Sequence, residues 1–157
     1  MHTEELSFKI SLSGTYHDKM PAYSILLDDT LIKQATITQP TDVIEVIEFT
    51  APISEGSHEL KIRLENKDSS DTIVRKERDD STEYEIIKDM LLNIVGIEVD
   101  EISLGQLIWD SEYILDKPIL IDDVIVEKND KCVNFGHNGT YVLSFTSPFY
   151  LWLLEKI

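Results

Sequence analysis

The sequence contains one cysteine, Cys132, which excludes an intrachain disulfide and gives no sign of an oxidising compartment. It also lacks an apolar run long enough to cross a bilayer, because the longest stretch near the end, FYLWLL, is far too short. The first residues, MHTEELSF, lack a basic region followed by an apolar one, so we expect no secretory signal and synthesis in a cytoplasm. These absences predict a chain that does not insert into a membrane.

Positive charge is scarce. Lysine and arginine number 14 against 30 aspartates and glutamates, which leaves a formal net charge of −16. Such a surface repels phosphate backbones and anionic lipids, so we expect no nucleic-acid partner. Cations, neutral sugars and basic protein surfaces remain compatible with it. Solubility or a salty habitat explains the same acidity, so charge alone names no partner.

Signatures of catalysis are also missing. The sequence has no glycine-rich phosphate loop, no G-x-S-x-G, no H-E-x-x-H and no C-x-x-C, and its four histidines share no metal-ligand spacing. The acidic pairs Asp79-Asp80 and Asp122-Asp123 are poorly placed to share a substrate, because neighbouring strand residues face opposite ways. We therefore expect a protein that is not an enzyme, with a small two-carboxylate hydrolase as the remaining enzymatic alternative.

Apolar residues alternate with polar ones along most of the chain, as in Phe8-Ile10-Leu12, Tyr23-Ile25-Leu27 and Leu60-Ile62-Leu64. About nine such short segments, separated by turn residues, predict an all-β protein: an antiparallel, jelly-roll-like β-sandwich. At 157 residues the chain is expected to form a single domain, residues 1–157. One helix is predicted at residues 147–156, with Ser147 as its N-cap and Pro148 in its first turn.

Two connections carry specific expectations. The polar segment 66–88 is longer than most loops, so we expect it to be functional, mobile or itself a small hairpin. Asn138-Gly139 is typical of a type I′ hairpin turn, in which both residues have positive φ angles.

Oxygen-bearing side chains follow the strand that ends at Leu64. Asn66, Asp68 and Asp71 lie in one polar segment, and Asp89 immediately precedes the apolar strand that returns after it. If the two strands are neighbours, all four side chains meet, and a hard cation such as Ca²⁺ prefers such oxygen ligands. They are candidate metal ligands, with ordinary loop acids as the alternative.

The order of these pieces resembles the calcium-dependent xylan-binding modules. The resemblance rests on Leu26 to Asp29, Gly56-Ser57-His58, Asn66 to Asp68, Asp89, and Ile97 to Asp100. It implies a β-sandwich jelly roll in which sugar hydroxyls ligate an exposed calcium. Two departures weaken the calcium expectation: Lys67 interrupts the asparagine–aspartate loop, and Met90 stands where that group tends to have arginine.

The last part of the chain has a different resemblance. Residues 138–155, NGTYVLSFTSPFYLWLLE, are similar to the ends of small virion-associated proteins of tailed bacteriophages, especially marine ones. The resemblance implies a structural or host-contact role, with an aromatic anchor for a neighbouring subunit at Phe149, Tyr150, Trp152 and Leu153. The alternative is that the helix folds back over the open end of its own sandwich, and both can hold if its two faces differ.

Two further aromatic residues are candidates for sugar binding. The indole of Trp109 offers a face on which a sugar ring can stack, although a tryptophan is more often part of a core or interface. Tyr84 lies in the polar segment, where an exposed ring would suit recognition.

The sequence thus predicts a non-catalytic structural or interaction module, built on a carbohydrate-binding-like sandwich. The first hypothesis places it in a tailed-phage virion, in contact with other protein subunits and possible glycans of the host surface. The alternative is a calcium-dependent glycan-binding module of a cellular protein, located in the cytoplasm.

Overall fold

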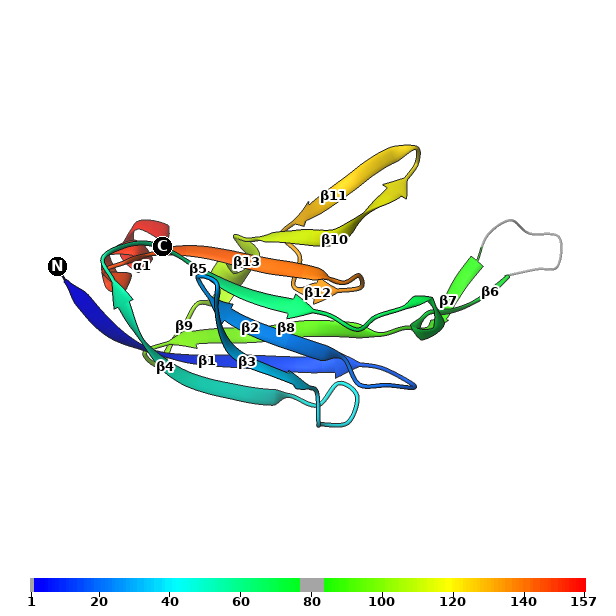
Figure 1. Ribbon diagram of the computed structural model, residues 1–157, viewed down its shortest axis with the longest axis horizontal. Coiled ribbons are helices and arrows are strands. Elements are labelled where there is room, and N and C mark those ends of the chain that lie inside the picture. The colour runs from blue at the N-terminus through cyan, green and yellow to red at the C-terminus, as the bar shows by residue number, and fades with distance from the viewer. Residues whose placement is uncertain (1, 77–83) are drawn as a thin grey trace.

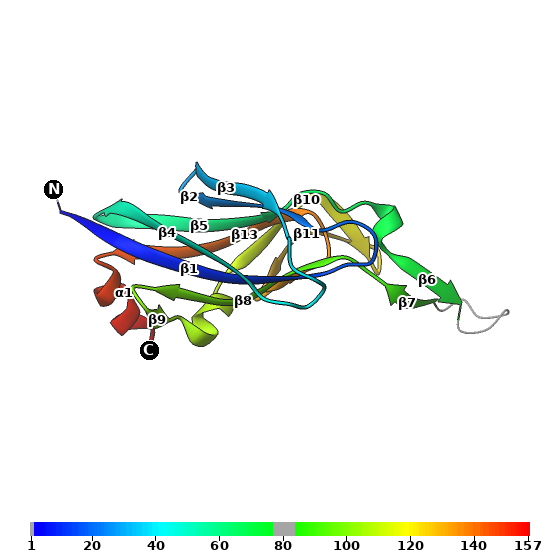
Figure 2. The same cartoon turned by 90° about the horizontal axis from the view of Figure 1, so that it is seen from below.

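Two antiparallel sheets pack face to face and form the body of the molecule (Figures 1 and 2). The protein is described from a computed structural model, which places residues 2–76 and 84–157. One sheet has the strand order β12-β8-β1-β4, with β9 paired to β8, and the other has the order β11-β10-β13-β5-β2-β3. The predicted antiparallel β-sandwich with a short C-terminal helix is therefore confirmed.

The strands have the following bounds. The first sheet contains β1 Thr3–Thr15, β4 Glu45–Ser54, β8 Leu91–Val99, β9 Ile102–Ser103 and β12 Asn134–Phe135. The second sheet contains β2 Ala22–Leu27, β3 Thr30–Thr36, β5 Gly56–Leu64, β10 Glu112–Ile121, β11 Val124–Asp130 and β13 Gly139–Ser147. A separate hairpin is formed by β6 Ile73–Lys76 and β7 Tyr84–Lys88, and the helices are η1 Ser69–Asp71, η2 Gly105–Trp109 and α1 Phe149–Lys156.

The core follows from the alternation of side chains along each strand. On β5, Leu60 and Ile62 are buried, whereas Lys61 between them points to the outer face. Across the sheet, Leu60 lies opposite Leu143 and Ile62 lies opposite Tyr141, so the buried residues of neighbouring strands line the same inner face.

Acidic residues take the left-handed backbone of the tight turns. Asp122 and Asp123 have φ angles of 48° and 65° between β10 and β11, and Asp28 has a φ angle of 53° between β2 and β3. The predicted type I′ turn at Asn138-Gly139 is wrong, because neither residue has a positive φ angle. Gly139 instead begins β13 at a close approach, where an added Cβ would lie 2.5 Å from the carbonyl oxygen of Ile114.

The terminal helix α1 folds back against its own sandwich (Figure 1). Phe149 and Trp152 are buried, and Trp152 contacts Phe145 of β13 with 6.3 Å between ring centroids. The predicted N-cap is wrong: Pro148 is the N-cap, and the Phe149 N–H donates to the Glu4 carboxylate at 2.9 Å. Within the residues described, no helix is long and apolar enough to cross a membrane.

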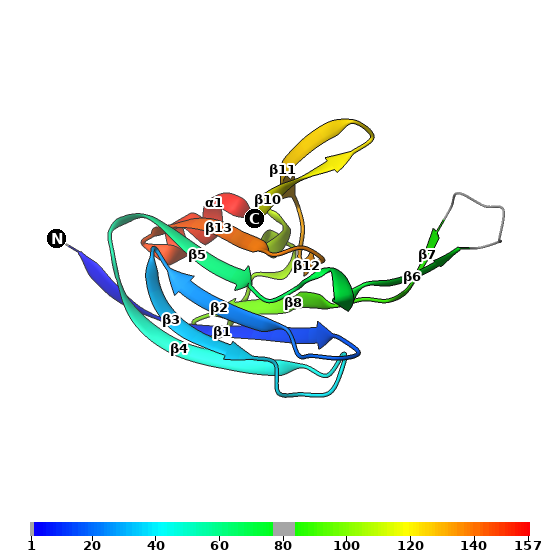
Figure 3. The same cartoon turned by 45° about the vertical axis from the view of Figure 1, so that its right-hand side comes forward.

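Two hairpins leave the body of the molecule in different directions (Figure 3). The first arises from the polar segment 66–88, which contains η1 and the β6–β7 hairpin. A small hairpin is one of the three forms that the sequence predicts for this segment.

The second, the β10–β11 hairpin, leaves the sheet after Leu115, the last residue of β10 that pairs with β13. Its register shifts between Ile114 and Ile119, where β10 has more residues than β11, and this irregularity redirects the outer half. We call residues 117–126 the arm.

Candidate functional site

The four predicted metal ligands lie at one end of the sandwich, beside the base of the β6–β7 hairpin, but they do not converge on one point. Asn66 uses both ends of its amide on the backbone, accepting from the Ala22 N–H at 2.8 Å and donating to the Met20 carbonyl at 3.0 Å. It therefore braces the start of β2 against the end of β5. We call this end of the molecule, which carries Asn66, Asp68, Asp71 and Asp89, the rim.

Asp68 and Asp71 form a unit with Lys19. Asp68 caps η1, and the buried Asp71 carboxylate accepts from the Asp68 N–H at 2.9 Å, which completes a capping box. The Lys19 Nζ lies 2.7 Å from Asp68 Oδ2 and 3.1 Å from Asp71 Oδ2. The hydrogen bond from Lys19, together with those from Ser70, lowers the pKa of Asp68 to about 2.

Asp89 is paired with a different lysine. Its Oδ1 atom lies 2.6 Å from Lys67 Nζ and also accepts from the Thr72 hydroxyl at 2.7 Å and the Met90 N–H at 2.9 Å. The Lys67 ammonium donates to the Gly136 carbonyl at 2.6 Å as well. Burial raises the pKa of Asp89, but its hydrogen bonds, first of all that from Lys67, outweigh burial and lower the pKa below its ordinary value of 3.8.

This arrangement does not fit a calcium site. A calcium ion takes six to eight oxygen ligands and relies on carboxylates for charge, whereas Asp68, Asp71 and Asp89 already pair with lysines or accept from backbone N–H groups. No group of three or more histidine, cysteine, aspartate or glutamate side chains in residues 2–76 and 84–157 is arranged to hold a metal ion. In the part of the chain that the structure describes, Lys19 and Lys67 pair with the three carboxylates, and a cation shared by Asn66, Asp68, Asp71 and Asp89 stays a prediction.

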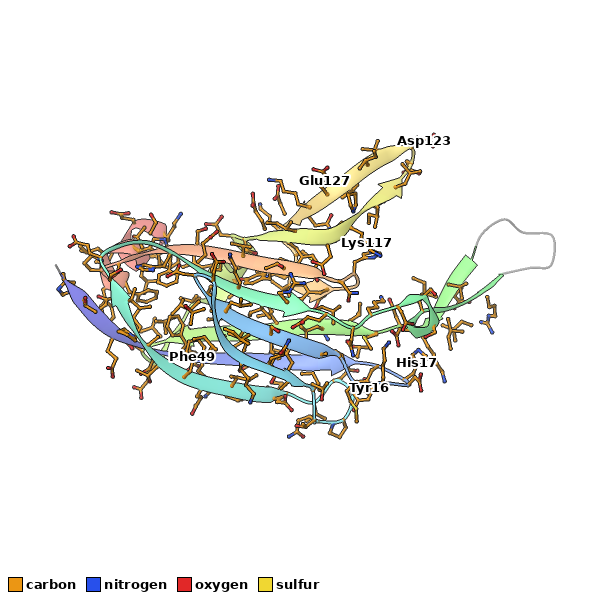
Figure 4. All side chains as sticks on the ribbon, in the orientation of Figure 1. Tyr16, His17, Phe49, Lys117, Asp123 and Glu127 are labelled. Atoms are coloured by element: carbon orange, nitrogen blue, oxygen red, sulfur yellow. The ribbon has the colours of Figure 1, made fainter. Side chains whose placement is uncertain are left out.

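A groove of 520 Å³ opens beside this cluster. Its polar lining includes Asp68, Ser69, Asp116, Lys117, His137 and Asn138. Lys117 projects from β10 near the beginning of β13, as Figure 4 shows. We call this hollow the rim groove.

A second groove of 440 Å³ contains Trp109. Trp109 ends η2 and is 41% exposed, so part of its indole faces solvent. The groove is also lined by Glu59, Ser111, Glu112, Asp130, Lys131 and Ser144. We call it the tryptophan groove. The sequence singles out Trp109 as a candidate, but it does not indicate Glu59 of β5 and Ser144 of β13, which lie beside it in the groove.

The other predicted contact residues have mixed placements. Phe149 and Trp152 are buried within their own domain, which corrects the prediction that they anchor a partner, while Leu153 is partly buried. Tyr150 is 50% exposed, and its hydroxyl donates to Asp100 at 3.1 Å. Tyr84 begins β7, and the position of its side chain lies outside what the structure describes.

Comparison with known proteins identifies the fold. No family model matches the chain, and no curated protein matches it. The chain is similar to a solved structure of vCBM60 in its selenomethionine form, with a TM-score of 0.51 and 12% identity. That structure is described with a circular permutation that links two families of calcium-dependent carbohydrate-binding modules. The match covers 88% of this chain and 89% of that chain. This likeness shows a shared fold.

The chain is also similar to a structure of vCBM60 in complex with galactobiose. It has a TM-score of 0.49 and 12% identity, and the match covers 87% of this chain and 96% of that chain. These matches do not test the resemblance of residues 138–155 to virion proteins, which stays a prediction.

Proposed function

We propose that this chain is a non-catalytic glycan-binding module and that the tryptophan groove is its binding surface. The observation that carries the proposal is the 41% exposure of Trp109 within a groove whose other lining side chains, apart from Val142, are polar. An exposed indole is a large apolar surface on which the C–H face of a sugar ring can pack. The vCBM60 fold, described in solved structures of carbohydrate-binding modules, supports the same proposal.

The charges of the groove favour a neutral sugar. Four acidic residues line it together with one lysine, Lys131, so acidic glycans would be repelled: Glu59, Asp110, Glu112 and Asp130. Carboxylates and the Ser144 hydroxyl are suitable hydrogen-bond partners for sugar hydroxyls. The proposed ligand is therefore a neutral oligosaccharide, and the resemblance of the sequence to xylan-binding modules favours one of the xylan class.

The absence of catalysis is part of this proposal. Asp122 and Asp123 form the exposed turn of the arm, where Figure 4 shows Asp123, and neither residue lines the rim groove or the tryptophan groove. The other acidic pair, Asp79-Asp80, lies outside the described residues.

The test is isothermal titration calorimetry with neutral xylo- and galacto-oligosaccharides. Trp109→Ala should weaken binding about tenfold or more, because the apolar stacking surface is removed, and Trp109→Phe should retain part of the affinity. Lys117→Ser, in the rim groove, is the matched control and should bind like the wild type. Absence of binding to every neutral oligosaccharide, or loss of binding in the control alone, would contradict the proposal.

A second candidate function is subunit contact, as expected for a component of an assembly such as a virion. It is supported by the arm, whose outer half exposes apolar side chains on both faces: Leu120 at 68%, Ile121 at 49%, Val124 at 61% and Ile125 at 68%. Strand β11 is also a sheet edge with unpaired backbone groups. We propose a second copy of the chain as the partner, pairing edge to edge through β11.

Sedimentation velocity at low and high salt tests this second candidate. The net charge of −16 repels identical chains, so self-association should strengthen as salt screens the charge. Leu120→Ser combined with Ile125→Ser should abolish it. A wild-type chain that stays monomeric at high concentration in high salt would remove this candidate.

A further inference from the structure

The Lys67 ammonium ties together three separate parts of the chain at the rim. Lys67 follows the end of β5, Asp89 precedes β8, and Gly136 lies between β12 and β13. The ammonium contacts the Asp89 carboxylate and the Gly136 carbonyl at 2.6 Å each. The backbone of Lys67 is held as well, because its N–H and C=O each form a 2.8 Å hydrogen bond with the Asn138 amide.

This pair is shielded from solvent. The Lys67 side chain is 11% exposed and the Asp89 side chain is 22% exposed. In such surroundings a carboxylate without a counter-charge is strongly unfavourable, so the position beside Asp89 requires a cation. A carboxylate oxygen and a backbone carbonyl are also the kinds of ligand that a hard metal ion takes.

We infer that Lys67 supplies this cation permanently, so that the rim of this chain is held by a tethered ammonium in place of a bound divalent metal. A tethered group cannot dissociate, and chelators cannot remove it. The stability that these contacts give the rim should therefore not depend on Ca²⁺, whereas the shared fold is described for carbohydrate-binding modules that are calcium-dependent. Calcium-independent glycan binding is a further consequence, and that part alone rests on the proposed function.

The experiment compares the melting temperature of the wild-type chain in EDTA, in millimolar CaCl₂ and in millimolar MgCl₂. The expected result is the same Tm in EDTA and CaCl₂, or an equal small response to both cations from screening of the acidic surface. A Tm that rises with Ca²⁺ beyond the response to Mg²⁺ would overturn the inference. No variant has to fold for this outcome to be decisive.

Two matched variants test the role of the ammonium itself. Lys67→Met keeps an unbranched side chain and removes the charge, and we expect Tm to fall by about 5 °C or more. Lys61→Met is the control, because Lys61 contacts Asp29 at the same 2.6 Å but Asp29 is 92% exposed. That pair is screened by water, and its loss should change Tm by about 2 °C or less.

The inference fails if Lys67→Met is no more destabilising than Lys61→Met. If Lys67→Met does not fold, Asp89→Asn replaces it and should also lower Tm by more than Lys61→Met does. Calorimetry with oligosaccharides in EDTA is recorded separately. No glycan binding in EDTA or in CaCl₂, with a Ca²⁺-independent Tm, would reject the proposed function and leave the tethered ammonium standing, whereas binding in CaCl₂ alone would reject only calcium-independent binding.

Discussion

The two ends of the sandwich are closed by different interactions. At the end near α1, apolar rings pack together: Phe145, Phe149 and Trp152 lie within 6.3 Å of one another by ring centroids, and Phe8 stacks on Phe49 at 4.8 Å. At the rim, the contacts that join the loops are hydrogen bonds and ion pairs centred on two lysines. Apolar packing is insensitive to the charge state of the protein, whereas the contacts at the rim require ionised groups. The two ends should therefore respond differently to truncation and to pH.

The helix end should be the most sensitive to truncation. Trp152→Ala removes a buried indole, since only 6% of the Trp152 surface is exposed. We expect a loss of about 3–5 kcal/mol in the free energy of unfolding. The control is Leu154→Ala on the solvent side of the same helix, where the side chain is 65% exposed and the expected change is about 0.5 kcal/mol or less. Urea unfolding measures both variants, and equal losses would show that α1 does not pack as described.

A substitution at the rim should reduce the free energy of unfolding by less, and that reduction should depend on pH. Asp89→Asn removes the carboxylate partner of Lys67, and we expect a loss of about 2 kcal/mol at neutral pH. Because the folded state lowers the pKa of Asp89, its contribution is fully present above the ordinary value of 3.8 and is lost as pH falls through the lower folded value. Urea unfolding of wild type and Asp89→Asn should therefore converge at acid pH. A difference that stays constant with pH would mean that ionised Asp89 is not the cause.

The smallest effect should have the opposite pH dependence, and it belongs to His58 near the helix end. Its Nδ1 lies 2.7 Å from Asp28 Oδ2, and its Nε2 faces the Ser54 carbonyl, so both ring nitrogens donate when the imidazole is charged. Burial lowers the pKa of His58, but these contacts outweigh it and raise the pKa above its ordinary value of 6.5.

The stability that the charged His58 contributes to the folded state is consequently fully present below pH 6.5, and it is lost as pH rises through the pKa of His58 in the folded state. Across that range the wild-type Tm should decline by about 2 °C relative to His58→Gln, which cannot titrate. Differential scanning calorimetry at several pH values provides the comparison. Parallel profiles for the two proteins would remove His58 as the titrating group.

The sequence predicted the sandwich because its signal is local. Alternation at Leu60-Ile62-Leu64 and at Phe8-Ile10-Leu12 identifies buried faces within single strands, and the structure buries all six residues. Asp28 takes the turn between β2 and β3 for an equally local reason, since aspartate tolerates left-handed backbone.

The partners of charged residues were not predictable in the same way. Lys67 is 22 residues from Asp89, and Lys19 is 49 residues from Asp68, so the sheet topology decides which lysine meets which carboxylate. In the sequence Lys67 interrupts a ligand pattern, and a lysine among acids is itself a sign of an internal counter-ion. Gly139 was misread because the local turn signal of Asn-Gly gave no indication of its close contact with Ile114 on β10.

The two tryptophans of the chain have contrasting surroundings, which makes them separate optical reporters. Trp152 is enclosed among rings and should emit at short wavelength, whereas the half-exposed Trp109 should emit at longer wavelength and be accessible to iodide or acrylamide. Fluorescence of the unlabelled protein can thus distinguish occupation of the groove on the outer face from loosening of the terminal helix. A sugar that protects only the red-shifted component from quenching would locate its own binding position without a dye or a crystal.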